Sequence, residues 1–183
     1  PSPPLPDINF FSLNNHNIKR VVRRWFKGTI EREIVIAQFG KISDWDVSSV
    51  TNMTDVFNGA EFDNVSNISN WNTSNVTNMT RMFQSSSFKG NISNWDTSKV
   101  KDMSDMFNGC SKFNQDIGNW DTSNVEDMNS MFREAFKFNR NISNWDTSNV
   151  TNMSSMFREA SSFNRNISNW DTSKVKDMSD MFD

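Results

Sequence analysis

Tryptophan recurs along this chain at a nearly constant interval. Gaps of 24 to 26 residues separate six of its tryptophans, which are Trp45, Trp71, Trp95, Trp120, Trp145 and Trp170. A repeat of this length is one supersecondary unit, and it cannot bury its apolar side chains by itself. Neighbouring copies must therefore stack and share a continuous core. The spacing predicts a solenoid and places any function on a surface that repeats.

The chain divides into three parts. Residues 1–16 form a proline-containing leader, and residues 41–183 form a solenoid of about six repeats, the last of them incomplete. Between them, residues 17–40 carry apolar side chains at helical spacing, with Gly28 and Gly40 as the stops of two helices. A solenoid needs a terminal element over the exposed apolar face of its first repeat. We therefore expect residues 17–40 to be an N-terminal helical cap.

Two patterns alternate inside each repeat. Residues 142–145 are a short extended element that predicts a strand paired with the same segment of the next copy. Apolar residues between 150 and 160 are spaced by three or four, which predicts a short helix. One short strand plus one short helix per repeat of about 25 residues is the geometry of leucine-rich repeats. The predicted fold class is α/β, a leucine-rich-repeat-like right-handed solenoid with a helical cap.

Composition excludes several classes of function. The net charge is -3, with 19 basic and 22 acidic residues interspersed, so the strongly basic face of a nucleic-acid-binding protein is missing. No apolar run is long enough to span a bilayer, and we expect no membrane insertion. Cys110 stands where other repeats carry alanine, which indicates a buried small hydrophobe, and His16 has no Cys or His partner nearby. We therefore expect no catalytic residues, no metal site, no cofactor and no enzymatic activity.

Several side chains recur in register and would form rows along the stack. The aspartates after the tryptophans could bind calcium, but stacked like charges repel unless each is held locally, so we favour a turn-capping role. This Asp row contains Asp46, Asp96, Asp121, Asp146 and Asp171, with Asn72 in the second repeat. Methionine and tryptophan rows suit core packing better than soft-metal binding or sugar stacking. A threonine row leaves an ice-binding surface open, and it contains Thr73, Thr97, Thr122, Thr147 and Thr172.

The repeat motif resembles that of a known family. Residues 141–157 read Asn-Ile-Ser-Asn-Trp-Asp-Thr-Ser-Asn-Val-Thr-Asn-Met-Ser-Ser-Met-Phe. This motif closely resembles the BspA-type leucine-rich-repeat surface proteins, which include tandem repeats of mycoplasma lipoproteins once classed as a domain of unknown function. The likeness covers residues 42–183. It implies a cell-surface or secreted protein that binds other proteins or cells and has no enzymatic activity.

We therefore expect a non-enzymatic binding or adhesion module whose partner is a protein or a glycan. The predicted strand face would present a ladder of amides to that partner, the Asn row, which contains Asn70, Asn94, Asn119, Asn144 and Asn169. The alternative is a structural subunit of a filament, shell or virion-type particle. Such a subunit would join a neighbour, or another copy of itself, through the uncapped end at Asp183.

Overall fold

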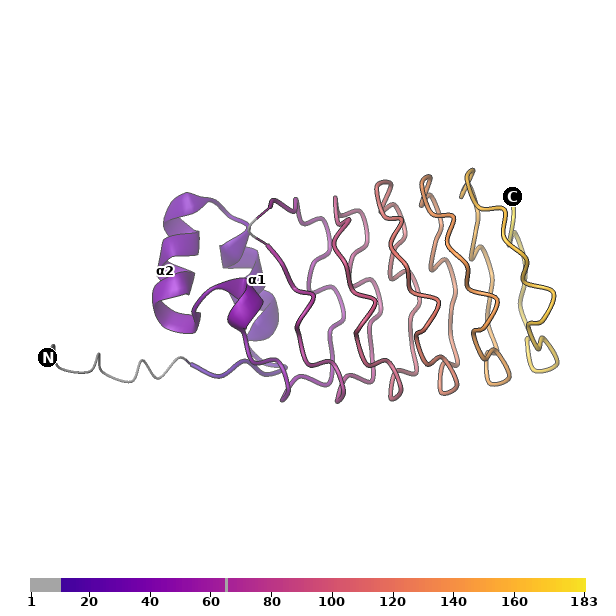
Figure 1. Ribbon diagram of the computed structural model, residues 1–183, viewed down its shortest axis with the longest axis horizontal. Coiled ribbons are helices and arrows are strands. Elements are labelled where there is room, and N and C mark those ends of the chain that lie inside the picture. Colours follow the sequence, from indigo (N-terminus) through magenta and orange to yellow (C-terminus); the bar gives the residue numbers. More distant parts are fainter. Residues whose placement is uncertain (1–10, 65) are drawn as a thin grey trace, which may run out of the picture.

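The computed structural model describes residues 11–64 and 66–183, so most of the predicted leader lies outside the described residues. Figure 1 shows an elongated stack with two helices at one end and a series of chain turns lying side by side after them. Helix α1 spans Ile18–Trp25, helix α2 spans Thr29–Phe39, and a short 3-10 helix, η1, spans Ile42–Asp44. We call the single irregular turn of chain that each repeat makes a coil.

Both helices lie where the apolar spacing and the glycines predict them. α1 buries the apolar stripe that ends at Trp25. Gly28 has a φ of 135°, a conformation that L side chains rarely adopt, and it lets the chain reverse between α1 and α2. The ring of Trp25 packs edge-on against the ring of Trp45, with centroids 5.6 Å apart. α1 therefore covers the apolar side chains of the first coil.

The predicted α/β fold class is wrong, because after η1 the described residues contain neither a strand nor an α-helix. Residues 142–145, predicted as a strand, form a turn in which the Trp145 amide donates to the Ile142 carbonyl at 3.2 Å. Residues 150–160, predicted as a helix, are a series of such turns, for example from Met156 to Met153 at 3.2 Å. An α-helix would bond each amide to the fourth residue back. Here each turn amide bonds to the third residue back instead, and apolar side chains three residues apart resemble a helical stripe in the sequence.

A main-chain ladder one residue wide joins the coils. One residue per coil forms an isolated parallel bridge with its counterpart, and the next amide donates to that counterpart, as Met153 does to the Asp177 carbonyl at 2.9 Å. Beyond the bridge, alternate amides donate to the following coil, and those between them close turns within their own coil. The residues that form these bridges are Asn52, Asn78, Asp102, Asp127, Asn152 and Asp177. The ladder therefore passes through the segment that was predicted to be helical.

Left-handed backbone at two positions per coil accompanies this alternation. In one of the two columns, Gly59 and Gly109 have a φ of 69°, but Glu134 and Glu159 adopt similar values of 55° and 57°. A left-handed residue other than glycine costs about 1–2 kcal/mol. The amides of all four residues donate to the neighbouring coil at 2.8–2.9 Å, and these hydrogen bonds offset the strain.

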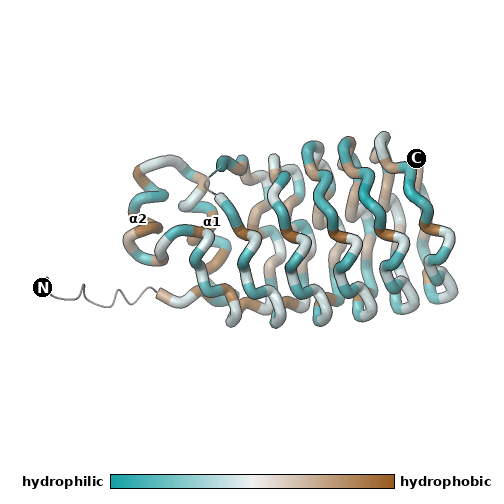
Figure 2. The backbone as a smooth tube through the Cα atoms, in the orientation of Figure 1, coloured by the Kyte–Doolittle hydropathy of each residue, from teal (hydrophilic) through white to brown (hydrophobic). Residues whose placement is uncertain are grey.

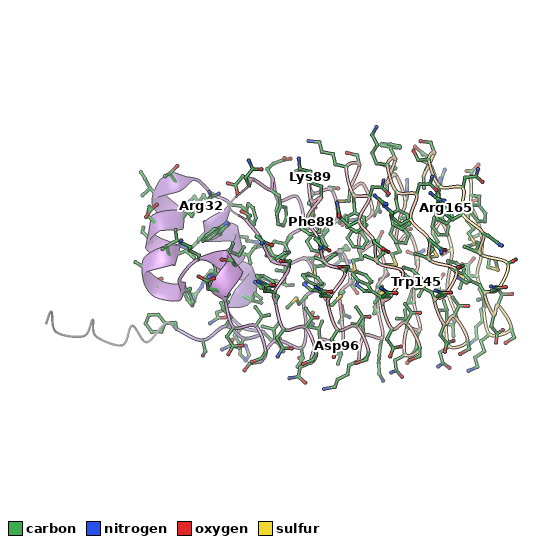
Figure 3. All side chains as sticks on the ribbon, in the orientation of Figure 1. Arg32, Phe88, Lys89, Asp96, Trp145 and Arg165 are labelled. Atoms are coloured by element: carbon green, nitrogen blue, oxygen red, sulfur yellow. The ribbon has the colours of Figure 1, made fainter. Side chains whose placement is uncertain are left out.

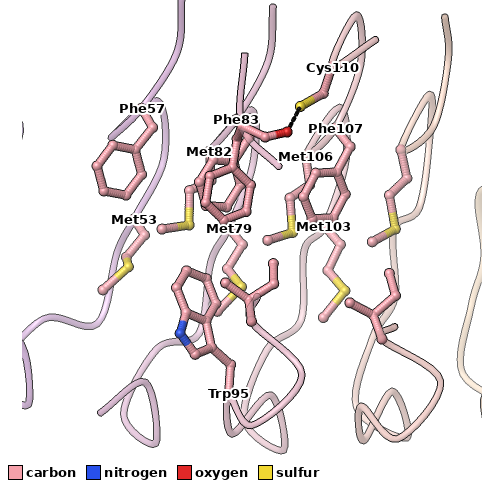
Figure 4. Close-up of a cluster of buried hydrophobic side chains, with 14 of the residues drawn as sticks. Met53, Phe57, Met79, Met82, Phe83, Trp95, Met103, Met106, Phe107 and Cys110 are labelled. Carbon is pink, nitrogen blue, oxygen red and sulfur yellow. Dashed lines mark hydrogen bonds between the residues drawn. The ribbon is translucent and has the colours of Figure 1, made fainter. Parts of the chain in front are cut away.

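Columns of equivalent side chains fill the interior. The rings of Phe83 and Phe107 lie parallel with centroids 5.5 Å apart, and Phe107 stacks on Phe113 of its own coil at 3.9 Å. Methionines form further columns beside them, as Figure 4 shows for Met79 and Met103. Figure 2 shows apolar positions at the same height in successive coils. The predicted core roles of the methionine and tryptophan rows are therefore confirmed for the inner repeats, and Cys110 is buried as predicted.

Two buried polar groups per coil are satisfied by the neighbouring coil. The indole Nε1 of Trp145 donates to the Ile117 carbonyl at 3.0 Å, and the hydroxyl of Thr147 donates to the Asp171 carbonyl at 2.9 Å. The same two bonds recur at Trp71, Trp95, Trp120 and Trp170 and at Thr73, Thr97 and Thr122. These threonine hydroxyls are buried, so the threonine row is not an ice-binding surface.

The longer loop of the first repeat has a structural explanation. The first repeat is two residues longer than the others between Phe62 and Ile68. From this loop the Ser66 hydroxyl accepts a 2.9 Å hydrogen bond from the indole of Trp25, and Asp63 forms a 2.8 Å ion pair with Arg32 of α2. The extra residues therefore connect the first coil to the helical pair.

Candidate binding surface

Each member of the Asp row closes a turn in its own coil. The Asp96 carboxylate accepts hydrogen bonds from the hydroxyl and the amide of Ser98, at 2.6 and 2.9 Å. These bonds hold the pKa of Asp96 below its ordinary value, because they stabilise the charged form. Asn72 accepts the same bond from the Ser74 amide at 3.1 Å without a charge. The turn-capping role is confirmed. Nowhere in the described chain do three or more His, Cys, Asp or Glu side chains gather as metal ligands could.

Two further rows of Asn and Asp make the same turn. Asn141 accepts from the Ser143 amide, and Asn152 accepts from the Ser154 amide, both at 3.1 Å. In an Asn-x-Ser/Thr sequence the amide of the third residue is therefore the donor that the first residue needs. Turn chemistry therefore explains the Asn-x-Ser sequences at Asn141 and Asn152.

The Asn row differs from these rows. All five of its side chains are exposed, and none forms a hydrogen bond with a described residue. Each immediately precedes a buried tryptophan in the sequence. The burial of Trp145 in the core therefore fixes the position of Asn144 on the surface. The indoles of Trp145 and Trp170 are 6.3 Å apart. Five of the coils thus each present one amide that is not bonded to a described residue, on a rigid support, although a turn carries it and not the predicted strand.

A second polar surface, which the sequence pattern did not indicate, spans neighbouring coils. Asn124 and Asn149 each donate a 2.7 Å hydrogen bond to a carbonyl of the preceding coil, from Ser98 and Ser123 respectively. With Lys101, Glu126 and Thr151, these two asparagines line a shallow depression of about 310 Å³. The asparagine amides are already used within the protein. This depression therefore offers fewer free groups than the Asn row.

One carboxylate on the main-chain ladder lies where its charged form is disfavoured. Asp127 occupies the bridge position next to Asp102 of the preceding coil and Asn152 of the following one. Burial raises the pKa of Asp127, and the charges of Asp102 and Asp105 raise it further. Hydrogen bonds from the Asn129 amide and the Asn152 side chain oppose that rise.

Charged side chains lie along both long edges of the stack. In Figure 3, Lys89 and Arg165 lie along one edge and Asp96 lies along the other. The Nε of Arg165 donates to the Asn139 carbonyl at 3.0 Å, so its guanidinium is tied to the preceding coil. No helix in the described residues is long and apolar enough to cross a membrane.

These coils define a tandem-repeat protein with a fixed interior and an exposed polar surface. The sequence model of a family described as "Mycoplasma protein of unknown function, DUF285" matches the chain twice in tandem, at residues 12–89 and 84–183. The chain belongs to this family. No curated protein and no solved structure matches it.

Proposed function

We propose that this protein is a non-enzymatic binding module at a cell surface or in the extracellular space, and that the Asn row contacts its partner. The observation that carries the proposal is the set of five exposed amides with no hydrogen bond to a described residue. A primary amide both donates and accepts, so a row of them suits the hydroxyls of a glycan or the main chain of a protein. The resemblance of the repeat motif to BspA-type surface proteins supports the same role.

The coils give this surface its rigidity. Asn119 and Asn144 flank buried tryptophans whose indoles are each anchored to a carbonyl of an earlier coil, at 3.1 and 3.0 Å. Pre-organised groups lose less conformational entropy on binding than mobile ones. Partner selection would then depend on the residues that vary around the row.

A binding screen tests the proposal directly. The purified chain is applied to a printed glycan array and to a panel of immobilised extracellular-matrix and serum proteins. The double variant Asn119→Ala/Asn144→Ala is expected to lose binding by about tenfold, since each lost hydrogen bond contributes about 0.5–1.5 kcal/mol. The matched control Gln84→Ala/Asn108→Ala removes two amides elsewhere on the coils and should bind like the parent chain. A parent chain that binds no member of either panel, or a row variant that binds unchanged, contradicts the proposal.

A further inference from the structure

The helical end of the molecule differs in charge from the coils. Residues 11–41 contain seven Lys and Arg against two Glu, a net charge of +5. Residues 42–183 contain twelve Lys and Arg against nineteen Asp and Glu, a net charge of -7. The overall charge of -3 therefore hides a separation of sign along the molecule. Figure 1 shows that α1 and α2 together form one end of the stack, and the sequence places the positive charge there.

The positive charge lies on the outer side of α1. Arg20, Arg23 and Lys27 follow one another at helical spacing, opposite the buried stripe of the helix, and all three are exposed. Arg20 and Arg23 form no ion pair with a described residue. Glu31 is already bound to Arg24 at 2.8 Å and to Lys27 at 3.7 Å, and Glu33 is the other acidic group of the two helices. Within the described residues, Arg20 and Arg23 therefore have no acidic partner, and Lys27 shares Glu31 with Arg24.

Exposed aliphatic side chains accompany this charge on the neighbouring helix. Ile30 is 79% exposed and Ile34 is 39% exposed, one turn apart on α2. Val35 on the other side of the same helix is fully buried. In the inner coils of the described chain, Phe136 is the one large apolar side chain that is exposed. The helical end therefore combines cations that have no acidic partner among the described residues with exposed aliphatic side chains. The sides of the coils lack this combination.

We infer that the outer surface of α1 and α2 binds an anionic lipid surface, lying among the headgroups without crossing the bilayer. A basic helix face beside exposed aliphatic groups is the combination that binds such interfaces. A soluble polyanion would satisfy Arg20 and Arg23 but not Ile30 and Ile34. The coils of a second copy are acidic but offer little apolar surface along their sides. An anionic bilayer supplies both kinds of contact, and the stack would then project away from it.

Vesicle flotation with the full chain tests this inference. Vesicles of pure phosphatidylcholine are compared with vesicles containing one third phosphatidylglycerol at low ionic strength. We expect the chain to bind the anionic vesicles and to dissociate as salt rises, because the attraction is screened beyond a Debye length. Arg20→Gln/Arg23→Gln should lower the partition coefficient about thirtyfold, which corresponds to about 1 kcal/mol per basic residue. The control Lys101→Gln/Lys176→Gln removes the same charge from the coils and should bind like the parent chain.

The apolar contribution is tested separately. Ile30→Ser/Ile34→Ser should lower vesicle binding about tenfold and leave binding to soluble polyphosphate unchanged, because only a lipid interface buries these side chains. Thermal melting of each variant verifies that the helices remain folded. The inference is overturned if the parent chain does not float with anionic vesicles, or if the arginine variant floats as well as the parent. It is also overturned if the isoleucine variant binds vesicles normally, since the partner is then any polyanion.

Discussion

The indole of Trp145 reaches back across the stack to donate a 3.0 Å hydrogen bond to the main-chain carbonyl of Ile117, 28 residues earlier. One side chain therefore fills the core and also fixes the register between coils. Equivalent bonds recur at the other inner tryptophans. The constant tryptophan interval in the sequence follows from this pairing, because each indole needs a carbonyl at the same place in the coil before it.

Replacing Trp145 by phenylalanine tests the contribution of this bond. Trp145→Phe keeps an aromatic ring but removes the indole donor, so the Ile117 carbonyl keeps only its 3.2 Å hydrogen bond from the Trp120 amide. We expect a loss of about 1–3 kcal/mol in the free energy of unfolding, from the lost hydrogen bond and a partly empty site. Urea denaturation measures it. The neighbouring change Asn144→Ala should alter stability by less than about 0.5 kcal/mol, since surface substitutions rarely do more. Equal effects at the two positions would contradict the assignment.

The left-handed columns make a prediction about glycine. Gly59 has a φ of 69°, and no atom lies within 4 Å of the position where a Cβ would stand. Gly59→Ala should therefore destabilise the protein by about 1 kcal/mol through backbone strain alone. Glu134→Ala, at the same position of a later coil, replaces one non-glycine residue by another and should be nearly neutral. Thermal unfolding of the pair measures the difference, and an alanine tolerated at both positions would argue against the strained backbone.

Asp127 should limit stability at neutral pH. Its raised pKa means that the folded protein favours the protonated carboxyl of Asp127. The protonated group therefore stabilises the fold fully at pH values below the ordinary aspartate pKa. This stabilisation is lost as the pH rises through the pKa that Asp127 has in the folded protein. Asp127→Asn removes the buried charge, and Asn52, Asn78 and Asn152 already occupy this row. We expect a gain of about 0.5–1 kcal/mol at pH 7 and no gain at pH 3. Unfolding at both pH values tests this, and a loss at pH 7 would refute it.

The Asp row should behave in the opposite way. The lowered pKa of Asp96 means that its contribution is present above the ordinary aspartate pKa and is lost as pH falls through the folded value. Asp96→Asn keeps the turn, as Asn72 does, but removes the charge-assisted bond to Ser98. Because Asp96 is exposed, solvent screening limits the expected loss at pH 7 to about 0.5 kcal/mol or less. The same loss at pH 2 would show that ionisation is not its cause.

The sequence predicts the architecture unevenly. The two helices follow from residues such as Val21 and Val22 and from the glycines, because local spacing determines an amphipathic helix. The inward position of the tryptophans follows from their period. The coil backbone does not, since Val150, Met153 and Met156 stand three residues apart, an interval that a helix shares. The hydrogen bonds to the neighbouring coil that favour the turns over a helix are non-local.

The candidate surface was likewise predicted from the sequence only in part. The exposed position of Asn144 follows from its place beside Trp145. The burial of Thr147 was missed, although Val47 at the same position of the first coil is an apolar residue that could have indicated it. The charge separation between helices and coils was present in the sequence but hidden by a net charge near zero. Whether the Asn row binds a partner stays a prediction.

Consecutive coils are joined by alternate main-chain amides and by tryptophan indoles, so that the interior is sealed and the Asn row stands on a rigid support. Hydrogen–deuterium exchange followed by NMR tests it most directly. The indole protons of Trp95, Trp120 and Trp145 and the inter-coil amides of Met128 and Phe132 are predicted to exchange only on global unfolding, because each donates to another coil. Exchange of these protons as fast as that of an exposed amide would contradict the claim.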